Sequence, residues 1–204
     1  LLIDTEHRSA SLYADEFEFD VIELQSFSPK LYTEAMDLAE ANDYAVVIID
    51  SASHAWAGKD GVLEFKDQVT ARSRTHDAFG AGWREASPLH NAFVERMLSL
   101  SERRHLIVTL RSKMAYVQEE DEKTGKTRIR KVGMQPVQRE GIEYEFSLVG
   151  DLDLENVLVV TKSRCQALNK VVIPTPGPQL ARDILAWLTD GAPMPELPAT
   201  PPPP

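Results

Sequence analysis

Short apolar runs, each long enough for one strand, recur along the first half of the chain. The clearest is Tyr44–Ile49, a continuous and largely β-branched run that is followed by Asp50. Runs of this kind are typical of central parallel strands that are covered on both faces. Three shorter runs have the same character and also predict strands: Leu1–Asp4, Val21–Leu24 and Leu106–Leu110.

Segments with helical spacing separate these runs. A helix is predicted from Ser28 to about Ala41, because Leu31, Ala35 and Leu38 recur at helical spacing. Further helices are predicted over Ser9–Phe17, Val62–Ser73 and Ser87–Ser101. Strands that alternate with helices of this length imply βαβ crossovers. The expected fold is therefore α/β, with a mostly parallel sheet flanked by helices.

The pattern changes after Leu110, where strands follow one another closely. Ala115–Glu119 and Thr127–Val132 flank a turn that contains glycine, which predicts a hairpin. The remaining predicted elements are two close strands and a closing amphipathic helix: Phe146–Val149, Val157–Thr161 and Gln179–Leu188. We therefore expect antiparallel strands toward the C-terminus.

The two ends of the sequence differ in character. From Gly191 onward the chain is rich in proline and ends in Pro201–Pro204, so residues 192–204 are predicted to form a disordered tail. Residues 1–191 are predicted to form the folded domain. The first residues already have the character of a buried strand, and no initiator Met precedes them, so we expect the chain to start in mid-fold.

Composition and charge narrow the classes of function. The 204 residues carry 32 acidic and 22 basic side chains, a net charge of −10, so the overall field does not attract nucleic acid. Binding to DNA would need a local basic patch or assembly. No apolar run reaches the roughly 18 residues of a membrane span. The single cysteine excludes an intrachain disulfide and fits a reducing cytosol.

Two acidic residues directly follow predicted strands. P-loop NTPases use an apolar strand that ends in Asp, as at Asp50, to place a carboxylate near Mg²⁺ at the C-terminal edge of the sheet. The alternative is an Asp that caps the next turn. Glu6 lies two residues past the first strand, where it can accept a proton from water that attacks a phosphate. The alternative there is a solvated loop acid.

Three cations also follow predicted strands. Lys162 and Arg164 are spaced i, i+2 at a strand end, which puts both side chains on one face of the strand. Cations so placed can neutralise the charge that develops on a phosphate, and a solvated basic edge is the alternative. Arg111 lies just past a buried strand and can clamp a phosphate from there.

Five segments combine these residues in a fixed order: Leu2–His7, Val47–Ser51, Ile107–Lys113, Val137–Gly141 and Thr161–Cys165. In this order they resemble the RecA-like recombinase core. The resemblance is strongest to phage-encoded RecA-like nucleotide-binding proteins of single-strand annealing and recombination, and it covers roughly residues 1 to 191. It implies a cytoplasmic, RecA-like P-loop ATPase that uses ATP and Mg²⁺ and acts on single-stranded DNA.

The resemblance also implies a role for each candidate residue. Glu6 matches the glutamate that activates water, and Asp50 matches the Walker B carboxylate beside the metal. Arg111 stands where RecA proteins usually carry a Gln that reports the γ-phosphate, so it departs from that pattern while keeping a phosphate-facing position. Lys162 and Arg164 match the pair that reaches the neighbour's ATP. A head-to-tail homo-oligomer, filament or ring, with ATP between protomers is therefore implied.

The phosphate-binding loop of the family, GxxxxGK followed by Ser or Thr, does not occur in the sequence. Gly58-Lys59 and Gly125-Lys126 lack its spacing and its following helix. The family carries this loop before the strand that matches Leu1–Asp4. We therefore expect the 204-residue chain alone to bind ATP weakly.

Contact with DNA is expected at two loops. The loop after Asp50 contains Trp56 and Lys59, and an aromatic ring near a cation suits base stacking with phosphate contact. The second loop is the hairpin, whose cations are Lys123, Lys126, Arg128, Arg130 and Lys131. Glu119–Glu122 precedes them, so a solvated hairpin with internal charge pairs is the alternative. Single-stranded DNA and a single-strand DNA-binding protein are the implied partners.

Two other functions stay open from the residues: a non-catalytic, nucleotide-dependent scaffold, and another RecA-fold motor such as a helicase. The five histidines are scattered and accompany one cysteine, so no zinc site is predicted. Cys165 is predicted to be a buried strand residue rather than a nucleophile. Trp83 and Trp187 are predicted to anchor the core.

Overall fold

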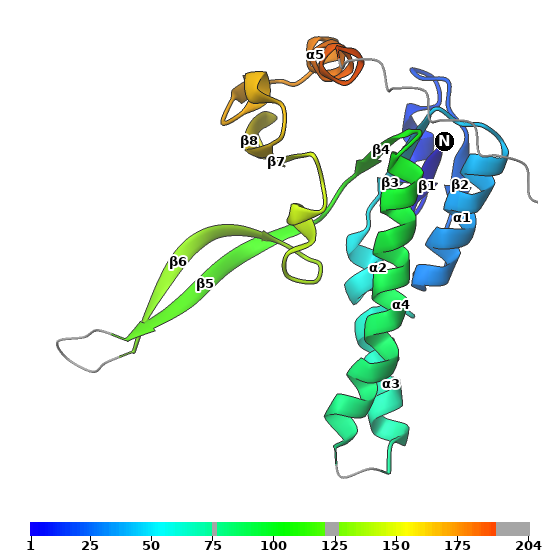
Figure 1. Cartoon of the computed structure of the whole chain (residues 1–204), viewed down its shortest axis with the longest axis vertical. Coiled ribbons are helices and arrows are strands. Elements are labelled where there is room, and N and C mark those ends of the chain that lie inside the picture. The colour runs from blue at the N-terminus through cyan, green and yellow to red at the C-terminus, as the bar shows by residue number, and fades with distance from the viewer. Residues whose placement is uncertain (75–76, 121–126, 191–204) are drawn as a thin grey trace, which may run out of the picture. The chain divides into compact units, whose positions relative to one another are not determined.

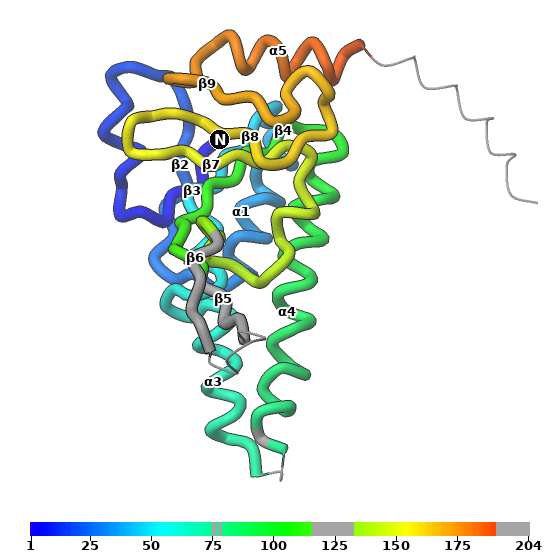
Figure 2. The backbone as a smooth tube through the Cα atoms, turned by 90° about the vertical axis from the view of Figure 1, so that its left-hand side faces the viewer, coloured from blue at the N-terminus to red at the C-terminus, as the bar shows by residue number. Residues whose placement is uncertain are grey.

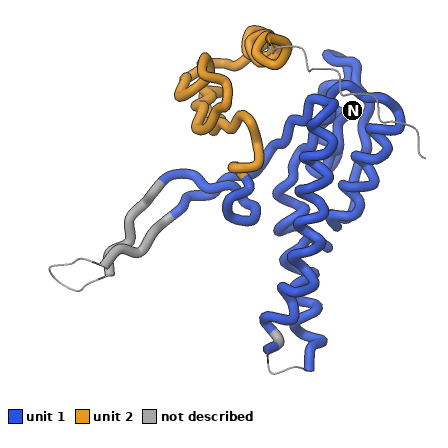
Figure 3. Tube along the Cα trace, viewed as in Figure 1, with its two compact units in different colours: residues 1–142 blue, residues 143–204 orange. Residues whose placement is uncertain are grey.

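The chain forms two compact units, Leu1–Ile142 and Glu143–Pro204 (Figure 3). The computed structural model describes residues 1–74, 77–120 and 127–190, without the side chains at 78, 116–120 and 127–132. A parallel sheet lies in the first unit and a smaller antiparallel sheet in the second. Within the described ranges no helix has the length and apolar character needed to cross a membrane.

Four parallel strands form the sheet of the first unit, in the order β2-β1-β3-β4 (Figure 1). Their bounds are Leu2–Asp4 for β1, Val21–Glu23 for β2, Val46–Asp50 for β3 and His105–Val108 for β4. The predicted α/β class and parallel sheet are confirmed. Asp4 lies opposite Asp50 on neighbouring strands, so the residues that follow these two strands emerge at the same edge.

Helices connect and cover these strands. They are η1 (Ser9–Tyr13), α1 (Pro29–Ala41), α2 (Ser53–Ala57), α3 (Val62–Arg72) and α4 (Ala78–Ser101). In Figures 1 and 2, α3 runs beside the first half of α4 and α1 beside its second half. The predicted helix over Ser9–Phe17 is a shorter 3₁₀ turn.

The start of α4 was predicted wrongly. The helix begins at Ala78 rather than Ser87 and contains Pro88. Asp77 caps its first turn by accepting a hydrogen bond from the backbone N–H of Gly80 at 2.8 Å. Glycine in the first turns and a proline in the interior both have low helix propensity, and for this reason the sequence predicts the later start at Ser87. The packing of α3 along α4 overrides this preference.

The core of the first unit lies between one face of the sheet and helices α1 and α4. Ile3, Val47 and Ile49 are fully buried on that face. Tyr32 of α1 and Phe93 of α4 are also buried, and their rings meet edge to face at 5.4 Å between centroids. The alternation of buried and half-exposed residues along β3 fits a strand with one tightly covered face.

A two-stranded hairpin follows the sheet. It pairs β5 (Ser112–Glu120) with β6 (Thr127–Pro136) in antiparallel fashion, as predicted. Arg111 immediately precedes β5 and Val137 immediately follows β6. The two ends of the hairpin therefore lie beside Arg111, shortly after the end of β4.

The second unit contains an antiparallel sheet in the order β7-β8-β9. Its elements are β7 (Leu148–Leu152), β8 (Val157–Ser163), η3 (Gln166–Leu168), β9 (Val172–Pro174) and α5 (Pro178–Thr189), and η2 (Ile142–Tyr144) spans the boundary between the units. Antiparallel strands toward the C-terminus are confirmed, although β9 was not predicted. Cys165 is buried but follows β8, and Trp187 is half-exposed on a helix with no buried residue, so it is not a core anchor. The predicted tail, residues 192–204, lies outside the described residues.

Candidate functional site

Three predicted residues meet at the carboxyl edge of the parallel sheet. Glu6 follows β1, Asp50 ends β3 and Arg111 follows β4. The Arg111 guanidinium forms an ion pair with the Glu6 carboxylate, although 105 residues separate them. Their predicted position at one edge of the sheet is therefore confirmed, and it is the edge at which open α/β folds bind ligands.

The Glu6 carboxylate is held through both of its oxygens. Arg111 donates from Nε to Oε1 at 3.0 Å and from Nη2 to Oε2, and Ser51 Oγ donates to Oε1 at 3.2 Å. Burial by itself raises the pKa of Glu6. The hydrogen bond from Arg111, followed by the charges of His54 and Arg111, outweighs burial and lowers the pKa below its ordinary value. The carboxylate is therefore ionised and fully occupied in this arrangement.

Asp4, which no sequence pattern distinguishes, shapes the loop that carries Glu6. Its carboxylate is 1% exposed and accepts hydrogen bonds from the backbone N–H groups of Glu6 at 2.7 Å and Ala10 at 3.1 Å. A buried carboxylate that closes a turn in this way fixes the backbone on either side of it. Asp4 thus sets the point at which Glu6 leaves the sheet.

Asp50 is held by a neighbouring strand. Thr109 Oγ1, just after β4, donates a hydrogen bond to Asp50 Oδ1 at 2.5 Å. The peptide bond between Asp50 and Ser51 is cis. The hydrogen bond from Thr109 orients the Asp50 carboxylate at the same edge of the sheet as Glu6.

Thr5 and His54 contact each other beside Glu6. Thr5 Oγ1 lies 2.8 Å from His54 Nδ1 and 2.8 Å from the backbone nitrogen of Ser51. The His54 ring stacks on Phe27 at 4.6 Å between centroids, and its Nε2 lies 3.9 Å from Glu6 Oε1. In the sequence His54 is one of several scattered histidines. Its place four residues after Asp50 was the available signal.

The backbone of Arg111 is fixed by groups from two other segments. Its N–H donates to Ser53 Oγ at 2.9 Å, and its carbonyl accepts from the N–H of Val137 at 2.7 Å. Gln138, which is buried, donates from Nε2 to the carbonyl of Ala52 at 3.0 Å. The base of the hairpin is therefore bonded both to Arg111 and to the turn that follows Asp50.

The expected DNA loop after Asp50 is in fact largely a helix. Trp56 lies on α2, where its ring stacks on Trp83 at 5.9 Å and meets His90 edge to face at 5.3 Å. Most of the predicted loop is therefore a helix and its indole contacts two rings, and the contact of Trp56 with DNA stays a prediction. Lys59, beyond the helix, is exposed.

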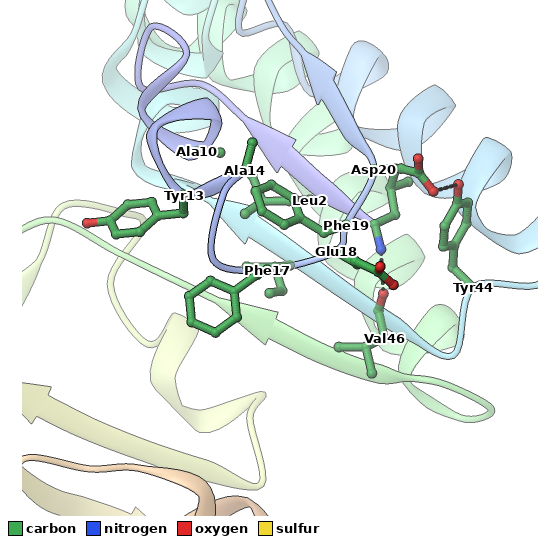
Figure 4. Close-up of a pocket in the computed structure, with 12 residues that line it drawn as sticks. Leu2, Ala10, Tyr13, Ala14, Phe17, Glu18, Phe19, Asp20, Tyr44 and Val46 are labelled. Carbon is green, nitrogen blue, oxygen red and sulfur yellow. Dashed lines mark hydrogen bonds between the residues drawn. The ribbon is translucent and has the colours of Figure 1, made fainter.

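A pocket of about 910 Å³ lies at the opposite end of the strands, where β1 and β3 begin (Figure 4). Its walls are mainly apolar and include Leu2, Tyr13 and Phe17, with Glu18 and Asp20 beside them. Acidic side chains repel phosphate. The residues that line this pocket include no basic side chain to offset its acids, whereas the carboxyl edge has Arg111 beside its carboxylates and is the better candidate for a phosphate.

The model of one protein family, described as an AAA domain, matches residues 1–177. That span is most of the 204 residues. The chain belongs to the AAA domain family. No curated protein and no solved structure gives a significant match. The family makes it an ATPase-type, nucleotide-binding domain with a P-loop-like fold, and such domains generally depend on nucleotide and Mg²⁺.

The donors at the carboxyl edge of the AAA domain suit Mg²⁺. Mg²⁺ prefers oxygen ligands and is usually held by one or two carboxylates together with waters and substrate phosphates. Asp50 supplies one carboxylate, oriented by the Thr109 hydroxyl. Among the described residues no group of three or more His, Cys, Asp or Glu could hold a metal by itself. A metal here would thus need the phosphates as ligands.

Lys162 of the AAA domain is bound within the second unit. Its Nζ donates to the carbonyls of Glu143 at 3.1 Å, Tyr144 at 2.6 Å and Phe146 at 2.7 Å. Arg164 is exposed, and no contact of its side chain is found in the described part of the chain. The two predicted phosphate cations therefore differ. The Lys162 ammonium is bound to backbone carbonyls, whereas the Arg164 guanidinium is exposed.

The structure does not describe the side chains of the predicted hairpin cations. Lys123 and Lys126 lie outside the described residues, and Arg128, Arg130 and Lys131 lie on β6 without described side chains. The backbone register pairs Arg128 with Glu119. The role of these cations toward DNA stays a prediction.

Proposed function

We propose that this AAA domain hydrolyses ATP, with Glu6 activating water and Asp50 beside the metal, and that it acts on single-stranded DNA in RecA-like phage recombination or annealing. The observation that carries the proposal is the meeting of Glu6, Asp50 and Arg111 at the carboxyl edge of a parallel sheet. Two carboxylates and one cation at that edge are among the groups that phosphoryl transfer uses.

In this proposal Arg111 can pair either with Glu6 or with the terminal phosphate of the nucleotide. In the structure its guanidinium forms an ion pair with Glu6. A terminal phosphate carries more negative charge than one carboxylate and also accepts bidentate hydrogen bonds from arginine. Its arrival would draw Arg111 away and free a Glu6 oxygen to take a proton from the attacking water. The pair therefore links water activation to the presence of the phosphate.

In this proposal Asp50 and Thr109 act at the Mg²⁺ site. The carboxylate, held by the Thr109 hydroxyl, would orient a water bound to Mg²⁺. When bound, Mg²⁺ neutralises phosphate charge. The loop that would cradle the β- and γ-phosphates, GxxxxGK followed by Ser or Thr, does not occur in this sequence, so ATPase tests belong on the full-length protein.

Replacing Glu6 with Gln tests the central role. The amide keeps the size of the side chain but cannot accept the proton, so ATP binding should persist while turnover falls by about 10²-fold or more. Asp50→Asn should also weaken Mg²⁺-dependent turnover. Steady-state hydrolysis near the wild-type rate for Glu6→Gln would refute the proposal.

The action on DNA and the shared ATP site rest on the resemblance to RecA-like proteins. We propose that protomers assemble head to tail, with Arg164, and Lys162 if its carbonyl contacts open, reaching the neighbour's nucleotide. Mixing Lys162→Ala subunits with Glu6→Gln subunits should then restore some composite sites. Absence of recovery at every mixing ratio would show that these cations serve their own subunit.

One observation favours a second function, a non-catalytic nucleotide-dependent scaffold. Both Glu6 oxygens are engaged by Arg111, which leaves the base occupied in the structure. If Arg111 stayed on Glu6 with nucleotide bound, nucleotide would drive assembly without hydrolysis. Equal and negligible turnover of wild type and Glu6→Gln, with nucleotide-dependent assembly retained, would favour this scaffold.

A further inference from the structure

The side chain of Gln138 lies buried between three parts of the first unit. The residue comes two positions after the end of β6 and is 7% exposed. Its Nε2 donates to the carbonyl of Ala52 at 3.0 Å, and its Oε1 accepts from the backbone N–H of Arg139 at 2.8 Å. The same Oε1 lies 3.1 Å from Nε2 of His90, on α4. One amide thus joins the end of the hairpin to the turn after β3 and to α4.

The partners of Gln138 fix the direction in which its amide points. The Ala52 carbonyl can only accept and the Arg139 N–H can only donate. Reversing the amide would therefore set two acceptors against each other and two donors against each other. With Oε1 facing His90, which must then donate, the proton of the neutral ring is on Nε2. All three contacts are then hydrogen bonds.

The turn that Gln138 holds also fixes the backbone of Arg111. Ala52 and Ser53 are both buried in this turn. Ser53 Oγ accepts from the N–H of Arg111 at 2.9 Å. The Arg111 carbonyl accepts from the N–H of Val137, the residue before Gln138, at 2.7 Å. Hydrogen bonds therefore close a ring through the turn, Arg111 and the end of the hairpin.

Both side chains that donate to the Glu6 carboxylate belong to this part of the chain. Arg111 donates from Nε at 3.0 Å, and Ser51, the residue before Ala52, donates from Oγ at 3.2 Å. A buried hydrogen-bond network whose members are all satisfied rigidifies the groups that it joins. Loss of the Gln138 amide would free the turn on its hairpin side, and both donors to Glu6 could then shift.

We infer that Gln138 is a positioning residue for the site at the carboxyl edge. It holds the turn after β3 against the end of the hairpin, so that Arg111 and Ser51 stay on Glu6. Its importance for hydrolysis rests on the proposed function. Because Gln138 follows β6 so closely, a ligand that displaces the base of the hairpin also displaces this amide. The contacts of Glu6 therefore depend on the position of the hairpin as well as on the sheet.

The Arg111 Nε–H proton tests this arrangement on the 204-residue chain without nucleotide. Its NMR resonance differs between a guanidinium paired with a carboxylate and a free one. Gln138→Met keeps the length of the side chain but removes its three hydrogen bonds, so the resonance should move toward that of a free guanidinium. An unchanged Arg111 resonance in a folded Gln138→Met chain would overturn the inference.

Gln135→Met is the matched control for this measurement. Gln135 lies on β6, three residues before Gln138, and its side chain has no contact in the described part of the chain. The same substitution there should leave the Arg111 resonance where it is in the wild type. Equal displacement by both variants would contradict the inference, because the hydrogen bonds of Gln138 would not be its cause.

Gln138→Glu keeps the inference testable if the methionine variant does not fold. As a neutral acid the new carboxyl can donate to the Ala52 carbonyl while it accepts from His90 and Arg139, and once ionised it cannot donate. Its ¹³C signal gives the pH at which it ionises. The Arg111 resonance should move toward the free position at that same pH, a step that the wild-type chain lacks. An Arg111 resonance that ignores this ionisation would overturn the inference.

In the full-length protein we expect a change in rate rather than in binding. Gln138→Met should lower kcat by about tenfold or more with little change in the KM for ATP, because a misplacement of about 1 Å at a catalytic group can cost up to about 10²-fold in rate. Gln135→Met should keep the wild-type kcat and KM. A raised KM with an unchanged kcat would show that Gln138 serves binding and does not position the catalytic group.

Two outcomes separate the inference from the function beneath it. If Glu6→Gln abolishes turnover while Gln138→Met keeps the wild-type kcat, the positioning role fails and the proposed function stands. If Glu6→Gln turns over normally, the proposed function fails. A displaced Arg111 resonance in Gln138→Met would still support the positioning of the Arg111–Glu6 pair in that case, since the measurement needs neither nucleotide nor turnover.

Discussion

Arg111 is the residue on which the state of Glu6 depends. Two guanidinium hydrogen bonds hold the carboxylate, and together with the charges of His54 and Arg111 they outweigh its burial. Arg111→Gln removes the charge and the bidentate contact. Burial, the largest single influence, then acts with less opposition, so the pKa of Glu6 should rise. A ¹³C NMR titration of the Glu6 carboxyl measures this shift directly.

Arg8→Gln is the matched control for that titration. Arg8 pairs with Glu23 at 2.8 Å on the surface, with its own side chain 74% exposed. The Arg8→Gln substitution also removes a guanidinium from the first unit but leaves the contacts of the Glu6 carboxylate intact. The pKa of Glu6 should therefore not change. If both variants shifted Glu6 equally, the effect would be one of net charge rather than of the contact.

Residue patterns could identify Glu6, Asp50 and Arg111 but not their partners. Parallel strands end at a common edge, so polar residues just past several buried strands are expected together there. Thr5, His54 and Gln138 could not be found in this way. Their contacts span 46 to 86 residues and depend on side-chain placement, which periodicity does not encode.

At the scale of elements, strands and helices with strong apolar patterns were predicted, and those with weak patterns were not. Strand β9 has three residues, too few to show a period. Helix α2 has five residues and follows β3 almost directly, so its residues read as a loop. Such short elements are set by tertiary contacts, here the rings around Trp56, rather than by local sequence.

Lys162 fastens the start of the second unit to β8. Lys162→Met keeps the aliphatic stem but leaves three carbonyls without the ammonium. We expect a loss of about 1–3 kcal/mol in the stability of the second unit, the usual cost of such groups left unpaired. Hydrogen exchange of the amides in β7 and β8 measures it.

Arg164→Met is the control for Lys162→Met. The Arg164 side chain is exposed and has no contact in the described chain, so its loss should change stability by less than about 0.5 kcal/mol. Equal effects of the two changes would contradict a stabilising role for the carbonyl contacts of Lys162.

The hairpin tests the proposed contact with single-stranded DNA. Each phosphate contact adds about 0.7 to the slope of log affinity against log salt for single strands. Replacing Lys126, Arg128 and Arg130 with Ala should therefore flatten the slope by roughly 2 if all three touch phosphates. The net charge of −10 makes binding elsewhere on the surface unfavourable. Unchanged affinity and slope would place the DNA elsewhere or show that none binds.

At the scale of the whole molecule, acid should destabilise the fold in two stages. Burial lowers the pKa of His54 and of His90 below the ordinary 6.5, and the pKa of Glu6 lies below the ordinary 4.5. The unfolded chain therefore takes up protons first as pH falls. Stability should decline below about pH 6.5 through the histidines and again below about 4.5 through Glu6.

Chemical denaturation at a series of pH values measures this decline. The double variant His54→Asn, His90→Gln should show a flatter dependence between pH 7 and 5.5, because neither replacement titrates there. A slope identical to that of the wild type would mean that other groups govern acid sensitivity.

The small core of the second unit has a consequence for how the chain is cut by proteases. Its buried apolar residues in the described ranges are Val160, Cys165 and Leu168, and α5 buries none, with Leu185 and Leu188 about half exposed. Units with few buried contacts open at lower free energy than the rest of a protein, and cleavage follows the open population. Trace protease should thus remove the second unit first and leave a resistant fragment that ends near Ile142 and retains the sheet with Glu6 and Asp50.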